Sequence, residues 1–196
     1  MQEDRLARAF EAFDAYNSQD PNLETDGGQS FPKEVLYANR MTRRLAAFAP
    51  EAPEYVQLAA RCQHIGRWEI PRSSYPMDRK GYLTWRTELK RHHASIAERI
   101  LKSCGYDDAT IELVKFLLLK KQLHTNPDTQ LLEDIVCLVF LEHYLEDFAS
   151  RHEEDKVVEI LRKTLKKMSP RAISEAPGLV RSDYVRKLLE KAVAEA

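Results

Sequence analysis

Apolar residues recur every three or four positions through most of the chain, which is the period of an amphipathic helix. In the first such segment Leu6, Phe10 and Phe13 fall on one side. Pro, Gly and Asn-Pro steps separate these segments, and none shows the alternation typical of a strand. The pattern predicts an all-α fold of about eight helices. Their expected positions are near residues 4–17, 31–48, 53–66, 79–103, 107–121, 128–150, 153–168 and 182–194.

The sequence also predicts two loops, the end of one helix and the burial of another. The polar stretch after Asn17 is expected to be a loop, and residues 69–78, with two prolines, an ordered surface loop of the kind that often covers sites. Gly105 is expected to end the long fourth helix in the left-handed conformation. Residues 128–150 are apolar nearly all round, so this helix is expected to be buried at the centre.

The size of the chain fits one compact helical domain. It has 196 residues, of which 43% are hydrophobic and 31% charged, enough for a substantial core. We expect a single domain over residues 1–196, with an N-terminal helix and loop at 1–30, a core at 31–168 and a C-terminal helical extension at 169–196.

Charge and cysteine content narrow the class of protein. A net charge of −1 does not favour nucleic acid as a partner, so any polyanion site must be local. Cys62, Cys104 and Cys137 lack paired CxxC spacing, which excludes a zinc ribbon and favours reduced thiols. No segment resembles a signal peptide or a membrane span. We expect a cytoplasmic protein that does not enter a membrane; the sequence does not predict its oligomeric state.

The segment around His64 resembles two unrelated catalytic motifs. Residues 64–67, His-Ile-Gly-Arg, together with residues 167–171, Lys-Met-Ser-Pro-Arg, resemble the nucleotide-binding signatures of class I aminoacyl-tRNA synthetases. Residues 59–67 also resemble the small-residue, metal-binding helix of HD-domain phosphohydrolases. The synthetase motif works at the end of a parallel strand, whereas here it follows a predicted helix. Both short motifs are also imperfect, so the pattern favours an HD-domain-like arrangement.

The HD resemblance implies a metal site made from several helices. His64 stands in its His-Asp pair, whereas Gln63 and Tyr37 replace two usual ligands. Helical projection places His93 on the inner face of the fourth helix, where it could replace a lost ligand. The predicted metal ligands are therefore His64, His93 and Asp134, a set that suits Zn²⁺, Mn²⁺ or Fe²⁺. The alternative for His64 is a histidine of the core or of a helix end.

Asp134 is the clearest chemical anomaly in the pattern. It projects among leucines of the predicted central helix, where a bare carboxylate would be costly. It therefore belongs either to a site or to a buried ion pair. Gln130 and Glu133 project from the same end of this helix, so Glu133 and Asp134 are the predicted catalytic residues, with Gln130 touching substrate.

Basic residues surround the same segment. Arg67, Arg72 and Arg79 border the proline-rich loop beside His64, and Lys120 adds another positive group. Arginine forks and aromatic faces can hold a phosphate and a planar group, so these four are predicted to bind substrate. The alternative is a solvated helix face, which is the favoured interpretation of most single members of the wider cluster.

The chain as a whole resembles the uncharacterised family catalogued as domain of unknown function 4202, some of whose members are labelled glutamyl-tRNA synthetase. The resemblance runs from about Asp20 to Met168 and depends on blocks that include residues 20–22, 32–37, 40–41, 61–72, 75–79, 85–86, 93–94, 132–134, 137–142 and 167–169. It implies no settled activity.

Three functional hypotheses follow. The first is a metal-dependent phosphohydrolase that acts on a nucleotide or small phosphate ester. The second is a non-catalytic HD-like module that binds a nucleotide, RNA or a protein. The third, a glutamyl-tRNA synthetase-like activity, depends only on the two short motifs.

Overall fold

The computed structural model describes residues 2–194 and divides the chain into two compact helical units. The first unit ends at Lys121 and the second begins at Gln122. The prediction of an all-α class is confirmed, with one small β-hairpin added. The division lies inside the segment that the sequence led us to expect as one core.

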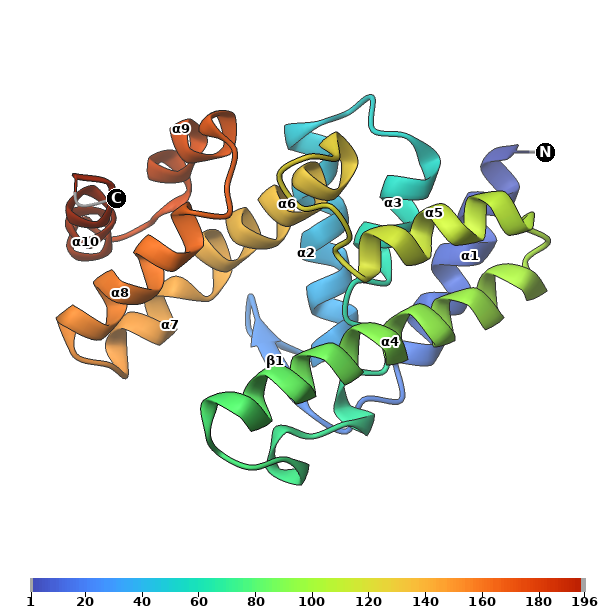
Figure 1. Ribbon diagram of the computed structural model, residues 1–196, viewed down its shortest axis with the longest axis horizontal. Helices are drawn as coiled ribbons and strands as arrows, with labels where there is room; N and C mark the ends of the chain where they lie inside the picture. Colours follow the sequence, from blue (N-terminus) through green and yellow to red (C-terminus); the bar gives the residue numbers. More distant parts are fainter. Residues whose placement is uncertain (1, 195–196) are drawn as a thin grey trace. The chain divides into compact units, whose positions relative to one another are not determined.

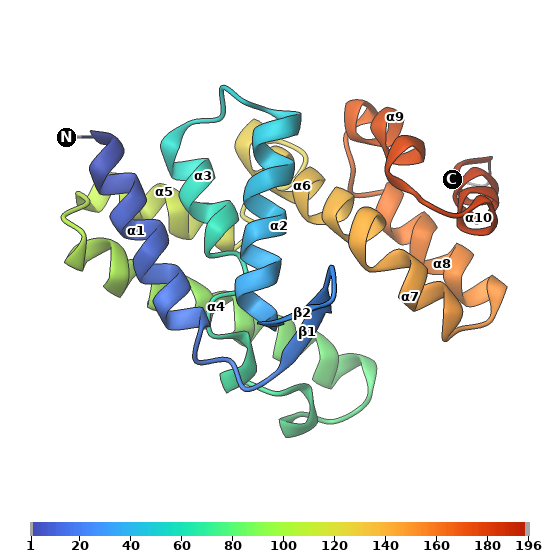
Figure 2. The same cartoon turned by 180° about the vertical axis from the view of Figure 1, so that it is seen from behind.

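The first unit is built around a short helix that three others surround (Figures 1 and 2). Helix α3 packs against α1, α2 and α5, and α4 packs along α5. Phe13, Met41, Leu58, Leu101 and Ile111 fill the space between these helices. The elements are α1 (Gln2–Asn17), β1 (Leu23–Asp26), β2 (Gln29–Pro32), α2 (Lys33–Phe48), α3 (Glu54–Arg61), the 3₁₀ turns η1 (Arg67–Glu69) and η2 (Arg72–Ser74), α4 (Arg79–Ser103) and α5 (Asp108–Leu118).

The stretch expected to be a loop after α1 contains an antiparallel hairpin, visible beside the start of α2 in Figure 2. Its turn is Gly27-Gly28, and both glycines have positive φ, as a two-residue hairpin turn requires. Arg40 of α2 pairs with Glu24 of β1 and, at 3.4 Å, with Asp26. These ion pairs hold the exposed strands against α2. Neither strand has a buried face, so no alternation of apolar and polar residues predicts them from the sequence.

The second unit, as described to residue 194, contains five helices. Helix α6 packs against α7 and α9, and α10 packs against α8 and α7. Ile135, Leu138, Leu145 and Leu161 are fully buried. The bounds are α6 (Pro127–His143), α7 (Leu145–Ser150), α8 (Glu154–Leu165), α9 (Pro170–Leu179) and α10 (Asp183–Ala194).

Two features of this unit differ from the sequence expectation. The helix expected over 128–150 is interrupted at Tyr144, which separates α6 from α7. Ser169-Pro170, which we expected to stop a helix, also begins one: the Ser169 hydroxyl accepts from the Ala172 N–H, and Pro170 occupies the first turn of α9. Of the helices within residues 2–194, none is long and apolar enough to cross a membrane.

Candidate functional site

The turn that follows α3 carries His64, the residue at the centre of both sequence motifs. Helix α3 ends at Arg61, and the chain turns through to Gly66, which has φ +66°. This left-handed conformation favours glycine, and a Cβ on Gly66 would lie 2.5 Å from Ile96 Cδ1, so the end of the Ile96 side chain would have to move. The Gly66 N–H donates to Asn17 Oδ1 at 3.2 Å. The turn therefore fixes the positions of His64 and Arg67, which lie on either side of Gly66 in the chain. A helix precedes His64, as predicted, and the synthetase interpretation requires a strand there.

Glu34, in the first turn of α2, joins His64 to Arg67. His64 Nδ1 lies 3.5 Å from Glu34 Oε2, and Arg67 Nε lies 3.9 Å from Glu34 Oε1. The Glu34 side chain is 5% exposed, whereas those of His64 and Arg67 are 23% and 28% exposed. A buried carboxyl group therefore lies behind two partly accessible basic side chains. We call Glu34, His64 and Arg67 the triad.

Burial controls the protonation of Glu34. It raises the pKa of this carboxyl group to about 7, against the opposing effect of Arg67, while Asp20 raises the pKa further. Asp20 Oδ2 also accepts a hydrogen bond from the Glu34 backbone N–H at 3.2 Å. Near neutral pH, Glu34 therefore exists in both its protonated and its ionised form.

His64 is held by ring contacts and kept neutral by its surroundings. Its ring stacks on Tyr37, with centroids 4.1 Å apart and planes 12° apart. Burial lowers the pKa of His64 well below its usual value, and the charges of Arg67, Arg86 and Lys120 lower it further. A neutral imidazole has one unprotonated ring nitrogen, which can accept a hydrogen bond or, once a neighbouring negative charge raises its pKa, a proton.

His93 of α4 lies beside His64 with its ring centroid 5.9 Å away. Its Nδ1 donates a hydrogen bond to the Ile65 carbonyl oxygen at 2.6 Å. The ring is neutral, because burial lowers the pKa of His93 to about 3. This hydrogen bond ties α4 to the turn that carries His64. His93 thus helps to hold the turn, and with it His64, in place.

The arginines predicted to bind substrate have different surroundings. The Arg67 guanidinium lies 5.0 Å from the Trp85 ring centroid, and Trp85 Nε1 is fixed by donating to the Ile70 carbonyl. Arg72 donates to the carbonyls of Tyr75 and Asp78, so it holds the proline-rich loop together. Arg79 is exposed in the first turn of α4.

The predicted residues of the second unit form a separate hydrogen-bonded group. Asp134 is buried and accepts from the Ser169 backbone N–H at 2.8 Å, the Ser169 hydroxyl at 2.6 Å and Gln130 Nε2 at 3.0 Å. Gln130 also donates to the Lys167 carbonyl, and Glu133 lies 3.9 Å from the Lys167 ammonium. Three donors stabilise the buried Asp134 carboxyl group, and they fasten the start of α9 to α6.

The predicted metal set is therefore divided between the units: His64 and His93 belong to the first unit and Asp134 to the second. Within the described part of the chain, no three His, Cys, Asp or Glu side chains gather in a way that could hold a metal ion. The donor set in the first unit does not fit a metal ion as it stands, and the predicted metal site stays a prediction.

The sequence analysis missed Glu34, the residue that links the triad. One signal was available: Glu34, Tyr37, Ala38 and Met41 have the spacing of one helix face, and all four are buried. An acid in the first turn of a helix is usually interpreted as a favourable charge near the helix N-terminus, so the burial of Glu34 was not predicted.

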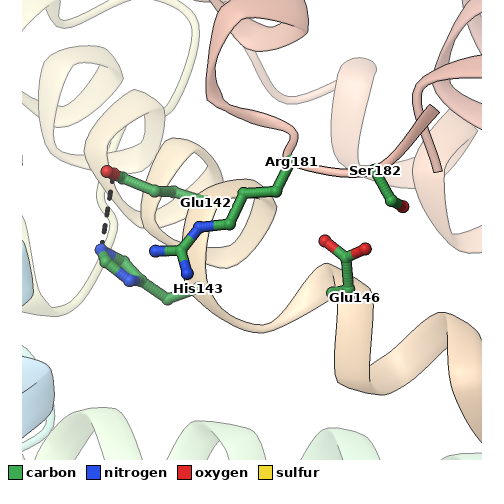
Figure 3. A pocket seen from close by; sticks show the side chains of 5 residues that line it. All are labelled: Glu142, His143, Glu146, Arg181 and Ser182. Atoms are coloured by element: carbon green, nitrogen blue, oxygen red, sulfur yellow. Dashed lines mark ion pairs between the residues drawn. The ribbon is translucent and has the colours of Figure 1, made fainter. Parts of the chain in front are cut away.

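A surface pocket of the second unit contains none of the predicted residues. Its volume is about 390 Å³, and Figure 3 shows Arg181 reaching between the C-terminal end of α6 and the start of α7. His143 Nε2 lies 3.5 Å from Glu142 Oε2. The lining side chains carry charges of both signs and are Glu142, His143, Glu146, Arg181 and Ser182.

Comparison with known proteins identifies one family. A family model described as "Domain of unknown function (DUF4202)" matches residues 7–189. No curated protein and no solved structure matches the chain.

Proposed function

The chain belongs to the DUF4202 family, and we propose that its first unit binds a nucleotide or another small phosphate ester at the triad and hydrolyses it. The observation that carries this proposal is a buried carboxyl group, Glu34, in reach of a partly accessible neutral imidazole and a partly accessible guanidinium. Acid–base and anion-binding groups are thus combined in one place.

The positive groups are arranged to bind a phosphoryl group. Arg67, a member of the triad, is partly accessible, and the positive charges of Arg86 and Lys120 lower the pKa of His64. Arginine binds phosphate oxygens through paired N–H donors, and fixed positive charge stabilises the charge that develops during phosphoryl transfer. The stacking of Arg67 on Trp85 limits the freedom of its guanidinium.

The triad supports proton transfer in hydrolysis. The water oxygen forms a new bond to phosphorus, the ester P–O bond breaks, and the leaving oxygen takes a proton from solvent. Neutral His64 accepts the proton that the attacking water loses, and Glu34 stabilises the resulting imidazolium across their 3.5 Å contact. This mechanism contains no step at a metal ion, because the donor set does not fit one.

The test is a hydrolysis screen with phosphate monoesters and nucleotides, in EDTA and separately with added Mn²⁺. We expect turnover in EDTA, a loss of at least about 100-fold in His64→Gln, and a clear loss in Arg67→Met. Arg91→Met is the matched control, because Arg91 is 67% exposed and pairs with Glu88 on the surface. Turnover only with Mn²⁺ would favour the metal-dependent hypothesis. Binding without turnover under all conditions would favour the non-catalytic module.

A further inference from the structure

Four side chains connect the triad to an exposed aromatic ring at the start of α4. Arg67, the most exposed member of the triad, has its guanidinium 5.0 Å from the Trp85 ring centroid. The Arg72 guanidinium lies 5.9 Å from the same centroid and 6.0 Å from the Tyr82 centroid. The centroids of Tyr82 and Trp85 are 5.9 Å apart, and their planes are tilted by 47°. We call these two arginines and two aromatic residues the platform.

The two rings of the platform differ in exposure. Trp85 is 8% exposed and its indole N–H donates to the Ile70 carbonyl, so this ring forms a buried floor. Tyr82 lies one turn earlier on α4 and is 44% exposed. A tyrosine ring presents a rigid, flat surface on which a planar group can stack. Tyr82 is therefore the ring of the platform that a ligand can reach.

Tyr82 and Arg72 are held in place by the loop before α4. Asp78 accepts from the Gly81 N–H at 2.6 Å through its carboxylate and from the Tyr82 N–H at 3.0 Å through its carbonyl. Arg72 donates to two carbonyls of the same loop. A Cβ on Gly81 would lie 2.1 Å from the Pro76 carbonyl oxygen, so glycine allows the loop to pack directly on the helix. Groups that are already ordered lose less entropy when a ligand binds.

The reach from the triad to Tyr82 suits a phosphate that is joined to a flat ring through a spacer. Arg67 and Tyr82 both contact Trp85, so their separation is at most the sum of their distances from its ring. A nucleotide has this form, because a sugar separates its phosphate from a planar base. The platform has one exposed ring and so offers a place for one base, whereas proteins that bind single strands stack successive bases on several rings.

Resting on the proposed function, we propose that the phosphate ester that binds at the triad is a mononucleotide whose base stacks on Tyr82. Its phosphate lies at Arg67, whose guanidinium can bind phosphate oxygens. Arg72 brings a positive charge to the same ring, and this charge also attracts the face of a stacked base. Stacking does not read the hydrogen-bonding edges of a base, so the site is expected to accept different bases.

Two phosphonates test this proposal. They are the analogues of AMP and of ribose 5-phosphate in which a CH₂ group replaces the ester oxygen, so this bond cannot be hydrolysed. We would measure their binding to the full chain by calorimetry at pH 7 in EDTA. The wild type is expected to bind the AMP analogue at least about tenfold more tightly, which is the effect of one stacked base. In Tyr82→Ala the two affinities should agree within about twofold.

Two further variants separate stacking from other effects. Tyr82→Phe keeps the ring without its hydroxyl group, so it should keep the preference for the AMP analogue. Tyr184→Ala removes a ring that is 51% exposed on α10, outside the platform, and should behave like the wild type. Because Tyr82 is exposed, its replacement is expected to leave the fold intact, and thermal unfolding of each variant checks this.

The outcomes separate this proposal from the proposed function. Equal binding of the two phosphonates by the wild type, or a preference that persists in Tyr82→Ala, overturns the base site while leaving a phosphate site at the triad. Loss of the preference in Tyr82→Phe overturns stacking, and tighter binding of a short single-stranded RNA than of the AMP analogue overturns a site for one base. If neither phosphonate nor inorganic phosphate binds the wild type, the proposed function fails, and the base site is overturned with it.

Discussion

At the scale of the residue, the triad contains groups whose charges are set by burial. Glu34 keeps a proton to an unusually high pH, whereas His64 and His93 lose theirs at an unusually low pH. The three shifts have one physical cause, the desolvation of charge, and they affect stability in opposite directions. The folded first unit is therefore sensitive to pH even without ligand.

We predict that acid destabilises the first unit through its histidines. Below pH 6.5 an unfolded chain protonates His64 and His93, which the folded unit keeps neutral, so each contributes a loss of stability as pH falls. Glu34 acts oppositely between pH 7 and 4.5, because only the folded unit holds its proton. One net proton remains, which is a loss of about 2 kcal/mol from pH 6.5 to 5.

Urea unfolding at the two pH values measures this loss. His93→Gln should nearly remove the pH dependence, since the Gln amide can still donate to the Ile65 carbonyl but does not titrate. His152→Gln, at an exposed histidine in the second unit, is the control. An unchanged pH dependence in His93→Gln would show that His93 is not the group responsible.

The sequence pattern singled out His64, His93, Arg67 and Lys120 because each stands out by residue type in a motif or on a helix face. It missed Glu34 because an acid in the first turn of a helix is usually interpreted as a solvated charge, although Glu34 shares a helix face with Tyr37, Ala38 and Met41. It also placed Asp134 in a site on the cost of burying its charge, whereas Ser169, 35 residues later in the chain, supplies two of its donors.

At the scale of the element, the turn between α3 and η1 determines the site. Gly66 allows the chain to reverse direction while its N–H binds Asn17 of α1. His93 fastens the same turn to α4. The relative positions of His64 and Arg67 therefore depend on contacts of one turn with two helices.

We predict that Gly66→Ala disrupts this turn. The left-handed conformation costs a non-glycine residue about 1–2 kcal/mol, and the new Cβ would lie 2.5 Å from Ile96 Cδ1. Since the end of the Ile96 side chain can move aside, we expect a loss of about 1–3 kcal/mol in the free energy of unfolding, together with weaker phosphate binding. Gly105→Ala is a matched control: it also has positive φ but open space around it, so it should be less destabilising and leave phosphate binding unchanged. Equal effects of the two changes on phosphate binding would contradict the role given to this turn.

The start of α9 gives a second prediction at this scale. Ser169→Ala removes the hydroxyl that accepts from the Ala172 N–H and donates to Asp134, which should cost about 1–2 kcal/mol. Ser174→Ala, an exposed serine inside α9, should cost little. Chemical denaturation measures both, and hydrolysis should be unaffected in either variant. A loss of hydrolysis in Ser169→Ala without a loss of stability would support the predicted catalytic role of Asp134.

The elements that the sequence predicted best have strong local signals. Helix α4 begins after Asp78, whose carboxylate accepts from the Gly81 N–H, and Gly105 follows its end with φ +80°, so the bounds 79–103 agree with the prediction. The hairpin was missed because its strands are four residues long and mostly exposed. The interruption at Tyr144 could not be predicted from the sequence, because no proline or glycine lies there.

At the scale of the whole molecule, the chain divides into two compact units, and the segment that joins them has an unusual backbone. Lys120, Gln122 and His124 all have positive φ, a conformation that costs non-glycine residues energy. Helical periodicity continues on both sides of this segment, so the sequence pattern gave no reason to place a boundary there. All members of the triad lie before it, and Lys120, which acts on His64, lies within it.

This division predicts that the first unit carries the binding activity. A fragment of residues 1–121 should be helical by circular dichroism and should bind inorganic phosphate as tightly as the full chain does. A fragment of residues 122–196 should not bind phosphate at the concentrations at which the first fragment is saturated. Phosphate binding by the second fragment alone would contradict the assignment of the site.

The most direct test of the central claim is the side-chain NMR spectrum of the histidines during a titration with inorganic phosphate at pH 7 in the presence of EDTA. The account predicts that the His64 imidazole resonances shift in a saturable way and that those of His152 in the second unit stay in place. It also predicts that Arg67→Met greatly weakens the His64 response. A His64 signal that phosphate leaves unchanged, in a folded wild-type protein, would contradict a phosphate site at the triad.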